Sequence, residues 1–298
     1  MDMQGKHPFI GVVVPVSAMA GKLMNLREWL PKAVDCNFQI VLVHDIKDLE
    51  TSRELIEIVE SFRQGQVRIL EGYFNSPGFA RNAGMDICTS EWIFFWDSDD
   101  LPNPFLALSL ISSTLENDPT TNFIVGGFQI KNLNAERLSA AYLAKNNFEL
   151  AIQIGLWRCA IKRSSIESRF LPLMMAEDQL FVAQNAKNWE ISFSSILIYQ
   201  YQVGSSTQLT TNRQAMRDLL PALQISINEL KYGENPNIDL IRGLVVSQFF
   251  STIKFAPIRM RVMGIFQIGI ALTRRDRALA RLLVARILEF RRRGKNEA

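Results

Sequence analysis

The chain has 298 residues, of which 48% are hydrophobic and 21% charged; this composition is typical of a globular protein and excludes a disordered, collagen-like or disulfide-based chain. Its three cysteines, Cys36, Cys88 and Cys159, form no CxxC pair and are odd in number. They argue against a structural zinc site and favour a reducing compartment. Only two histidines are present, so a histidine-rich metal site is excluded as well.

The net charge of +3 hides an uneven distribution along the chain. From Thr252 to Ala298 there are 12 Lys and Arg against 3 Asp and Glu, or +9, so the first 251 residues, with 21 against 27, carry −6. A basic tail can meet nucleic acid, an anionic membrane surface or only water. The N-terminus has no signal-peptide pattern, and the uncharged run from Val262 to Thr273 is too short to span a membrane. We therefore expect a cytoplasmic protein.

The first half of the sequence alternates short β-type runs with helical patterns, as in βαβ units stacked into a mainly parallel sheet. Continuous apolar runs predict strands that are covered on both faces, and helical periodicity with capping or glycine signals predicts the helices between them. The expected strands are 9–16, 39–44, 67–70, 92–96 and 123–130. The expected helices are 49–62, 77–88 and 103–117, the last with Asn103 as its cap.

The second half is more helical. Residues 132–161 give a weak pattern of helix and irregular structure, and a helix at 176–188 precedes two β-type runs at 190–193 and 196–202. Further helices are expected at 212–232, at 238–255, after Pro257 and at 274–293. The last is a basic amphipathic helix, whose apolar stripe is Leu279, Leu282, Leu283, Ile287 and Phe290 and whose other side carries Arg274, Arg277 and Arg281.

Three carboxylates directly follow the very apolar strand at 92–96. Ligands of open α/β sheets bind at the carboxyl ends of strands, which is where this cluster falls. Because alternate side chains of an extended chain share a side, Asp97 and Asp99 can converge on one ligand while Asp100 points elsewhere. Two close carboxylates suit Mg²⁺ or Mn²⁺, which bind through one or two carboxylates together with substrate phosphates. The alternative is an acidic turn that only ends the strand.

A second acidic strand end and an arginine strengthen the case for a site. Asp45 ends the second strand, on the same edge of the expected sheet, and the glycine-bearing segment 75–84 supplies Arg81 beside it. A guanidinium can bind phosphate in bidentate fashion and would complement a metal ion. The alternative is that Arg81 and Asn82 only tie their helix to a neighbouring loop.

These residues together resemble the inverting, GT-A fold glycosyltransferases of family 2, over roughly residues 8–208. The matching parts are the opening strand with Pro15, the strand end at Asp45, the segment 76–84, the cluster 97–100 and the segment 176–178. The fold implied is α/β and Rossmann-like, a mixed and mainly parallel sheet flanked by helices. Residues 1–208 would form the glycosyltransferase domain, with a nucleotide-sugar half at about 1–130 and an acceptor half at about 131–208. Residues 209–298 would form a basic helical extension.

The resemblance implies roles for the cluster. It corresponds to the DxD motif, in which Asp97 would contact the ribose and Asp99 would hold the Mn²⁺ or Mg²⁺ ion that bridges the diphosphate. Asp45 would accept a hydrogen bond from the base, typically uracil, although His44 replaces a frequent acidic residue before it. The residues placed at the nucleotide are Pro15, Val16, Ser17, Asp45, Arg81, Asp97, Ser98 and Asp99, and the donor is expected to be a UDP-sugar.

The segment from Ala176 to Asp178 resembles the ED motif of the family. Asp178 is implied to be the general base that deprotonates the acceptor hydroxyl, with Glu177 orienting the acceptor or the base. A positioned carboxylate typically contributes ~10²–10⁴-fold to the rate. The competing interpretation is helix capping, because acidic side chains meet free N–H groups in a first helical turn.

Two further segments resemble family elements less closely. Trp157 lies in a stretch where an aromatic faces the acceptor sugar, but it can equally belong to the core. The segment 199–207 resembles one that closes over the diphosphate. The sequence departs from the family pattern there, because Gln202 stands where a basic residue is common and no histidine follows.

The expected function is therefore metal-dependent transfer of a sugar from a nucleoside-diphosphate sugar to a glycan or a lipid-linked glycan. The basic C-terminal helix can lie on the inner face of the cell membrane, or its stripe can pack on this domain or on another subunit. Nucleic acid is not an expected partner, because the tail lacks exposed aromatics and a binding module. The alternatives are a non-catalytic scaffold and an aspartate-dependent phosphoryl-transfer enzyme. Against the latter, Leu101 replaces the expected Thr or Val and the cluster follows four strands.

Overall fold

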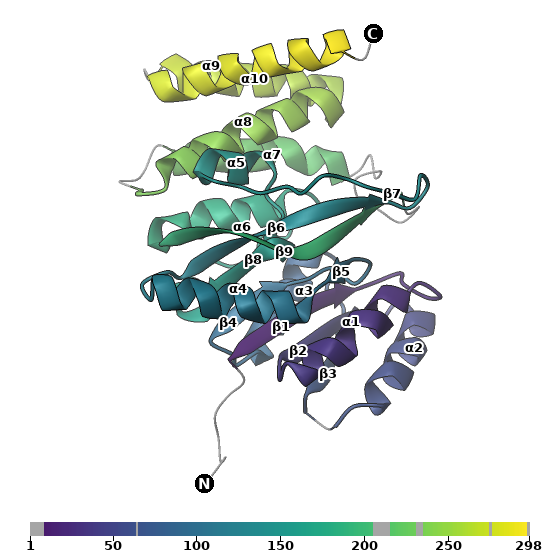
Figure 1. Cartoon of the computed structure of the whole chain (residues 1–298). Coiled ribbons are helices and arrows are strands. Elements are labelled where there is room, and N and C mark those ends of the chain that lie inside the picture. The colour runs from purple at the N-terminus through teal and green to yellow at the C-terminus, as the bar shows by residue number, and fades with distance from the viewer. Residues whose placement is uncertain (1–8, 64, 205–214, 231–234, 274–275, 297–298) are drawn as a thin grey trace. The chain divides into compact units, whose positions relative to one another are not determined.

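The computed structural model describes residues 9–63, 65–204, 215–230, 235–273 and 276–296. They form two compact units that interleave along the sequence. The first unit, called unit 1 here, comprises residues 1–145, 155–174 and 188–208, and unit 2 comprises residues 146–154, 175–187 and 209–298. Figure 1 labels the helices and strands of both units.

Unit 1 is built on a mixed sheet of order β3-β2-β1-β4-β8-β6-β9-β5, with β7 paired to β6. The first four strands are parallel to one another. They are β1 (Ile10–Val16), β2 (Gln39–Asp45), β3 (Val67–Gly72) and β4 (Trp92–Phe95). The others are β5 (Leu101–Pro102), β6 (Phe123–Asn132), β7 (Arg137–Leu138), β8 (Cys159–Lys162) and β9 (Ile191–Val203). The expected α/β fold with a mainly parallel first half is confirmed.

Helices cover both faces of the four parallel strands. The helices are α1 (Met24–Asp35), α2 (Leu49–Glu60), α3 (Pro77–Ile87) and α4 (Pro104–Asn117). Strand residues such as Val12 and Val14 share one core with Trp29 of α1 and Leu110 of α4. Side chains alternate along a strand, so Val13 faces the opposite side, where α3 packs. This two-sided cover explains why the strands have continuous apolar sequences.

Several elements differ from the sequence expectations. Helix α1 was not predicted, because its N-cap Leu23 makes no side-chain capping bond and Pro31 lies inside it. Strand β8 falls within a segment expected to be helical or irregular, and its pairing with β4 and β6 depends on residues far away in sequence. The two expected β-type runs after residue 190 form the single strand β9, whose register with β6 shifts between Val125 and Phe128.

Unit 2 is helical. Its helices are α5 (Asn147–Ile152), α6 (Glu177–Asn185), α7 (Leu219–Glu229), α8 (Ile238–Phe255), α9 (Ile258–Thr273) and α10 (Arg277–Asn296). The first residues of the helix expected at 212–232 lie outside the described residues. A core shared by four helices contains Leu223, Ile227, Val245, Val246, Ile268, Ala271, Leu279 and Leu283. No helix among the described residues combines the length and the hydrophobicity needed to cross a membrane.

The apolar stripe of the last helix, α10, packs inside unit 2. Leu279 and Leu283 are buried in the core just described, and Leu282 packs against it. Of the two interpretations given for this stripe, packing on its own domain is therefore the one observed for these residues. Arg274 and the side chain of Phe290 lie outside the described residues.

Candidate active site

The carboxyl ends of three parallel strands meet at one edge of the sheet of unit 1. Val16 at the end of β1 pairs with His44 near the end of β2. On the other side, Val13 pairs with Phe95, the last residue of β4. The order of the strands reverses between β1 and β4, because the chain runs outward through β2 and β3 and then returns. Ligands of open α/β sheets bind at such a point, and the acidic cluster follows β4 directly there.

Arg81 of α3 contacts the first carboxylate of the cluster. Its guanidinium donates to Asp97 Oδ1 at 2.9 Å, with the Arg81 side chain 9% exposed and that of Asp97 30% exposed. The same guanidinium lies over the ring of Phe170, 5.6 Å from its centre. A well-buried guanidinium beside a half-buried carboxylate neutralises part of the negative charge of the cluster.

The position of Arg81 is set by how closely α3 approaches the sheet. A β-carbon at Gly84, one helical turn later, would lie 2.3 Å from Val13 Cγ1 and 3.0 Å from Val43 Cγ2, so only glycine fits. Asn82 exchanges two hydrogen bonds with the backbone of Phe170, at 2.9 and 3.0 Å. For Asn82, the alternative that it ties the helix to a loop is therefore the one observed, whereas Arg81 faces the acidic cluster.

Burial and mutual repulsion perturb the rest of the cluster. The pKa of Asp99 is raised to about 6, first by burial and then by the negative charge of Asp97. The pKa of Asp100 is raised well above its ordinary value, first by burial and then by the charges of Asp97 and Asp99. Each carboxylate thus makes ionisation of the next one less favourable.

Asp100 faces strand β9 rather than solvent. Its Oδ1 accepts the backbone N–H of Gln202 at 2.7 Å. The hydroxyl of Tyr199, on the same strand, accepts the N–H of Asp97 at 3.1 Å. The side chain of Asp100 therefore links the turn after β4 to β9. Gln202, which stands where a basic residue was looked for, is buried and contributes its backbone here.

A divalent cation suits the donor set that Asp97 and Asp99 provide. Both are carboxylates, the hard ligands that Mg²⁺ and Mn²⁺ prefer. A cation would oppose both the burial and the repulsion from Asp97 that raise the pKa of Asp99. Across the described part of the chain, no group of three or more His, Cys, Asp or Glu side chains is arranged to hold a metal ion. A cation here would take its remaining ligands from substrate phosphates and water.

The nucleotide-side residues predicted from the sequence lie at the ends of β1 and β2. Pro15 and Asp45 are half-buried, Val16 is buried and Ser17 is exposed. Asp45 Oδ1 accepts the N–H of Lys47 at 3.2 Å. Ser98, in the turn after β4, is buried.

His44 holds the ends of β1 and β2 together. Its ring is fully buried, with Nδ1 3.2 Å from the carbonyl of Val16 and Nε2 3.0 Å from the carbonyl of Asp48. Asp48 caps α2 by accepting the N–H of Thr51. The residue at position 44 thus joins β1, β2 and the start of α2 inside the fold.

Glu177 and Asp178 form the first turn of α6 in unit 2. Glu177 is buried and Asp178 half-buried, and Asp178 Oδ1 accepts the N–H of Gln179 at 2.7 Å. Asp178 therefore makes the contact expected of a residue in a first helical turn. The preceding residue, Ala176, has a φ of 64° and a ψ of 14°, in the left-handed region. A non-glycine residue held there is strained, and such strain gathers at functional positions.

Three further parts of the chain bear on the sequence predictions: Trp157, the segment 199–207 and Asn25. Trp157 stacks on Tyr199 at 4.3 Å and on Tyr201 at 5.5 Å and packs against the core, which is the structural interpretation of this residue. Residues 205–207 of the segment expected to close over the diphosphate lie outside the described residues. The sequence analysis did not identify Asn25 as a site residue, because it lies on the unpredicted helix α1. Its side-chain amide donates a hydrogen bond to the backbone carbonyl of Asp99.

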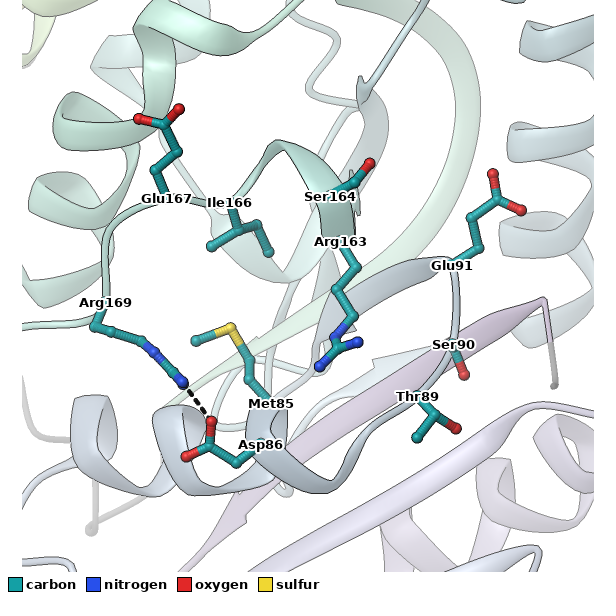
Figure 2. Close-up of a pocket in the computed structure, with 10 residues that line it drawn as sticks. All are labelled: Met85, Asp86, Thr89, Ser90, Glu91, Arg163, Ser164, Ile166, Glu167 and Arg169. Atoms are coloured by element: carbon teal, nitrogen blue, oxygen red, sulfur yellow. Dashed lines mark hydrogen bonds and ion pairs between the residues drawn. The ribbon is translucent and has the colours of Figure 1, made fainter.

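A separate cavity of about 410 Å³ opens at the other end of β4. Figure 2 shows its lining, which includes Ser90 and Glu91 just before that strand, Arg163, and the ion pair between Arg169 and Asp86. The cavity contains none of the residues predicted for the site.

Comparisons with known proteins agree with this geometry. Residues 25–158 match the family described as "Glycosyl transferase family 2". The chain is similar in structure to TarS 1–349 of S. aureus in complex with UDP-GlcNAc, with a TM-score of 0.69 and 15% identity over 88% of this chain and 80% of that chain. It is also similar to the mannosyltransferase PcManGT of Pyrobaculum calidifontis in complex with GDP-Man and Mn²⁺, with a TM-score of 0.60 and 14% identity over 95% of this chain and 80% of that one. No curated protein matches the chain in sequence.

The sheet, with the acidic cluster at its switch point, belongs to the same fold as these two solved structures, the GT-A fold. The segment that matches the family 2 model contains Arg81 and the acidic cluster. The resemblance noted in the sequence is thereby confirmed.

Proposed function

We propose that the protein transfers a sugar from a nucleoside-diphosphate sugar to a hydroxyl group of a glycan or a lipid-linked glycan, with inversion at the anomeric carbon. The observation that carries the proposal is the group of Asp97, Asp99 and Arg81 at the switch point of the sheet, inside a family 2 domain. A UDP-sugar is the preferred donor, because TarS 1–349 has been solved with UDP-GlcNAc. The complex of PcManGT with GDP-Man makes a guanine nucleotide the competing donor.

Asp97 and Asp99 would hold Mn²⁺ or Mg²⁺ together with the diphosphate, and the cation would stabilise negative charge on the leaving group. Asp45 and the residues Pro15 to Ser17 would bind the nucleoside, since they end the two strands beside the cluster. As the sugar–phosphate bond breaks, negative charge builds on the nucleoside diphosphate. Arg81, already fixed beside Asp97, is placed to stabilise that charge without having to reorganise.

Asp178 would act as the general base and Glu177 would orient it or the acceptor. The acceptor oxygen loses its proton to the Asp178 carboxylate as it attacks the anomeric carbon, and the leaving group departs from the opposite face, which gives inversion. The strained backbone at Ala176 supports this role, because it sets the direction in which the first turn of α6 presents its carboxylates.

A thermal-shift experiment tests the donor site. Uridine, guanosine, adenosine, cytidine and thymidine diphosphates are each added with Mn²⁺, with Mg²⁺ or with a chelator. A ligand at about 100 times its Kd stabilises the folded state by ~2.7 kcal/mol, so the correct nucleotide should raise the Tm clearly and only with metal present. Asp99→Asn is the matched control and should lose the shift. A protein whose Tm responds to none of the nucleotides is not a nucleotide-sugar transferase.

A further inference from the structure

The outer face of α9 is apolar and exposed. Ile258 is 80% exposed, Phe266 70% and Val262 63%, which is unusual for large apolar side chains. Further exposed apolar residues on the same helix are Met263, Ile265 and Ile270. A contiguous apolar surface of this kind marks a site of interaction with a protein or a membrane.

Helical geometry gathers these residues on one side. Positions 258, 262, 265, 266 and 270 recur at spacings of three and four residues, so they share a face. The opposite side of α9 carries Ile268 and Ala271, which are buried in the core of unit 2. The helix is therefore apolar on both sides although only one side is covered by its own unit. It has 16 residues, too few to span a bilayer.

Exposed positive charges border this apolar face. Lys254 and Arg259 lie near the start of α9, and Arg277 and Arg281 lie on α10, which packs beside α9 over α8 (Figure 1). The exposed side of α10 also carries Val284, Ile287 and Leu288. Apolar and basic side chains thus share the outer surface of these two helices.

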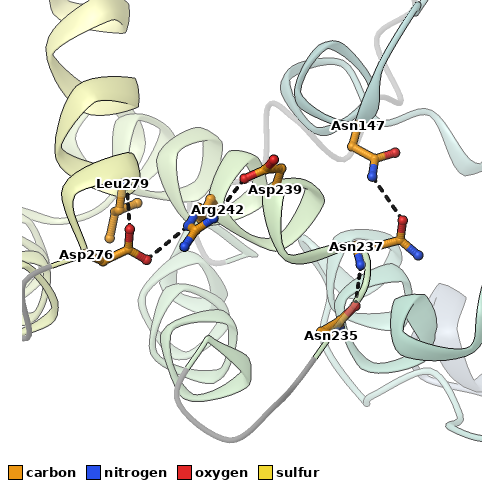
Figure 3. Close-up of polar contacts among 7 residues, drawn as sticks. All are labelled: Asn147, Asn235, Asn237, Asp239, Arg242, Asp276 and Leu279. Atoms are coloured by element: carbon orange, nitrogen blue, oxygen red, sulfur yellow. Dashed lines mark hydrogen bonds and ion pairs between the residues drawn. The ribbon is translucent and has the colours of Figure 1, made fainter.

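The one acidic residue between positions 254 and 288 is engaged inside unit 2. Asp276 accepts from Arg242 Nε at 3.0 Å and caps α10 through the N–H of Leu279 at 2.9 Å (Figure 3). Arg242 also pairs with Asp239 at 2.9 Å. The carboxylate of Asp276 is therefore turned to contacts within unit 2, and the exposed charged side chains described above beside the apolar face, Lys254, Arg259, Arg277 and Arg281, are cationic.

We infer that the outer face of α9, with the exposed part of α10, lies in the headgroup region of an anionic lipid bilayer. Apolar side chains enter the boundary of the acyl chains, while the flanking Lys and Arg side chains reach back to lipid phosphates. A second copy of the chain suits this surface less well. A two-fold contact would pair this positively charged surface with an identical positively charged surface, and like charges repel.

This inference does not depend on the identity of the donor or on the catalytic role of Asp178. If the proposed function holds, binding to a bilayer would bring the enzyme to a lipid-linked acceptor.

Vesicle flotation of the full chain tests the inference. The protein should float with vesicles that contain about a third anionic phosphatidylglycerol, should float much less with pure phosphatidylcholine, and should be released by high salt. The double variant Ile258→Ser/Phe266→Ser should lose at least about tenfold in binding, since it removes two of the most exposed apolar side chains. Arg259→Gln and Arg277→Gln should each weaken binding roughly fivefold.

Control variants distinguish a bilayer from a second copy of the chain as the occupant of this face. Phe105→Ser removes a similarly exposed aromatic, 53% accessible, from α4 of unit 1 and should leave flotation unchanged. The fluorescence that Phe266→Trp adds to the wild-type signal should be quenched by spin-labelled lipid. Of the native tryptophans, Trp29, Trp92, Trp96 and Trp189 are fully buried, and the half-buried Trp157 packs against the core of unit 1.

Two results overturn the inference: unchanged flotation of the double variant, or no flotation of the wild type. A dimer in light scattering that Ile258→Ser/Phe266→Ser dissociates, without vesicle binding, would instead assign the face to a second copy. Nucleotide-induced thermal shifts should be the same in all these variants, so failure here is distinct from failure of the donor site.

Discussion

Replacing Asp99 by asparagine should stabilise the ligand-free protein at neutral pH. The pKa of Asp99 is about 6 in the folded protein against an ordinary 3.8, because of burial and the charge of Asp97. The folded state therefore binds this proton more tightly than the unfolded chain does. The stability gained from the protonated group is complete below about pH 4 and is lost as the pH rises through about 6. The difference between the two pKa values corresponds to about 3 kcal/mol, an upper bound because Asp99 is partly exposed.

Urea unfolding with a chelator present measures this effect. Near pH 7, Asp99→Asn should exceed the wild type in unfolding free energy by ~1–3 kcal/mol, and near pH 4 the two proteins should be equal. Asp97→Asn is the contrasting variant. It leaves the well-buried guanidinium of Arg81 without this carboxylate and should lower the unfolding free energy by ~1–3 kcal/mol. An Asp99→Asn variant that is no more stable than the wild type near pH 7, or whose gain persists at pH 4, would refute the electrostatic argument.

Three further predictions concern catalysis, packing and the metal. Asp178→Asn should lower kcat by ~10²–10⁴-fold in a transfer assay and leave the nucleotide-induced thermal shift unchanged; a fully active variant would remove it as the base. Gly84→Ala places a β-carbon 2.3 Å from Val13 Cγ1 and should lower the unfolding free energy in urea by ~1–3 kcal/mol, whereas an unchanged value would contradict the close packing. Removing divalent metal should weaken nucleoside-diphosphate binding at least about tenfold in calorimetry, and equal affinity in a chelator would contradict the metal role of Asp97 and Asp99.

The strands and the acidic cluster could be predicted because their signals are local. A parallel strand covered on both faces needs a continuous apolar run, and the polar residues that follow it mark its exposed end. Helix α1 could not be predicted, since Pro31 and an uncapped start oppose a helix locally and the burial of Trp29 in the core outweighs them. Strand β8 depends on partners distant in sequence, which local patterns do not contain.

The contacts within the site could be predicted only in part. The sequence indicates that Arg81 and the carboxylates approach the same edge, but not that the guanidinium bonds to Asp97, because this depends on how closely α3 packs at Gly84. Likewise, the periodicity of the last helix correctly predicted an apolar face, but it could not predict that the other helices of unit 2 cover that face. The exposure of Ile258 on the preceding helix required the structure.

The repulsion among the carboxylates of the ligand-free cluster bears on how a cation and a diphosphate would bind there. The charge of Asp97 is partly neutralised by Arg81, and the raised pKa values of Asp99 and Asp100 show that further negative charge is unfavourable in the ligand-free fold. A diphosphate brought to this edge by itself would add to the repulsion, so carboxylates alone would oppose donor binding. A cation changes the sign of the local potential and makes both the carboxylates and the diphosphate favourable neighbours. Metal and nucleotide are therefore expected to bind together, each increasing the affinity for the other.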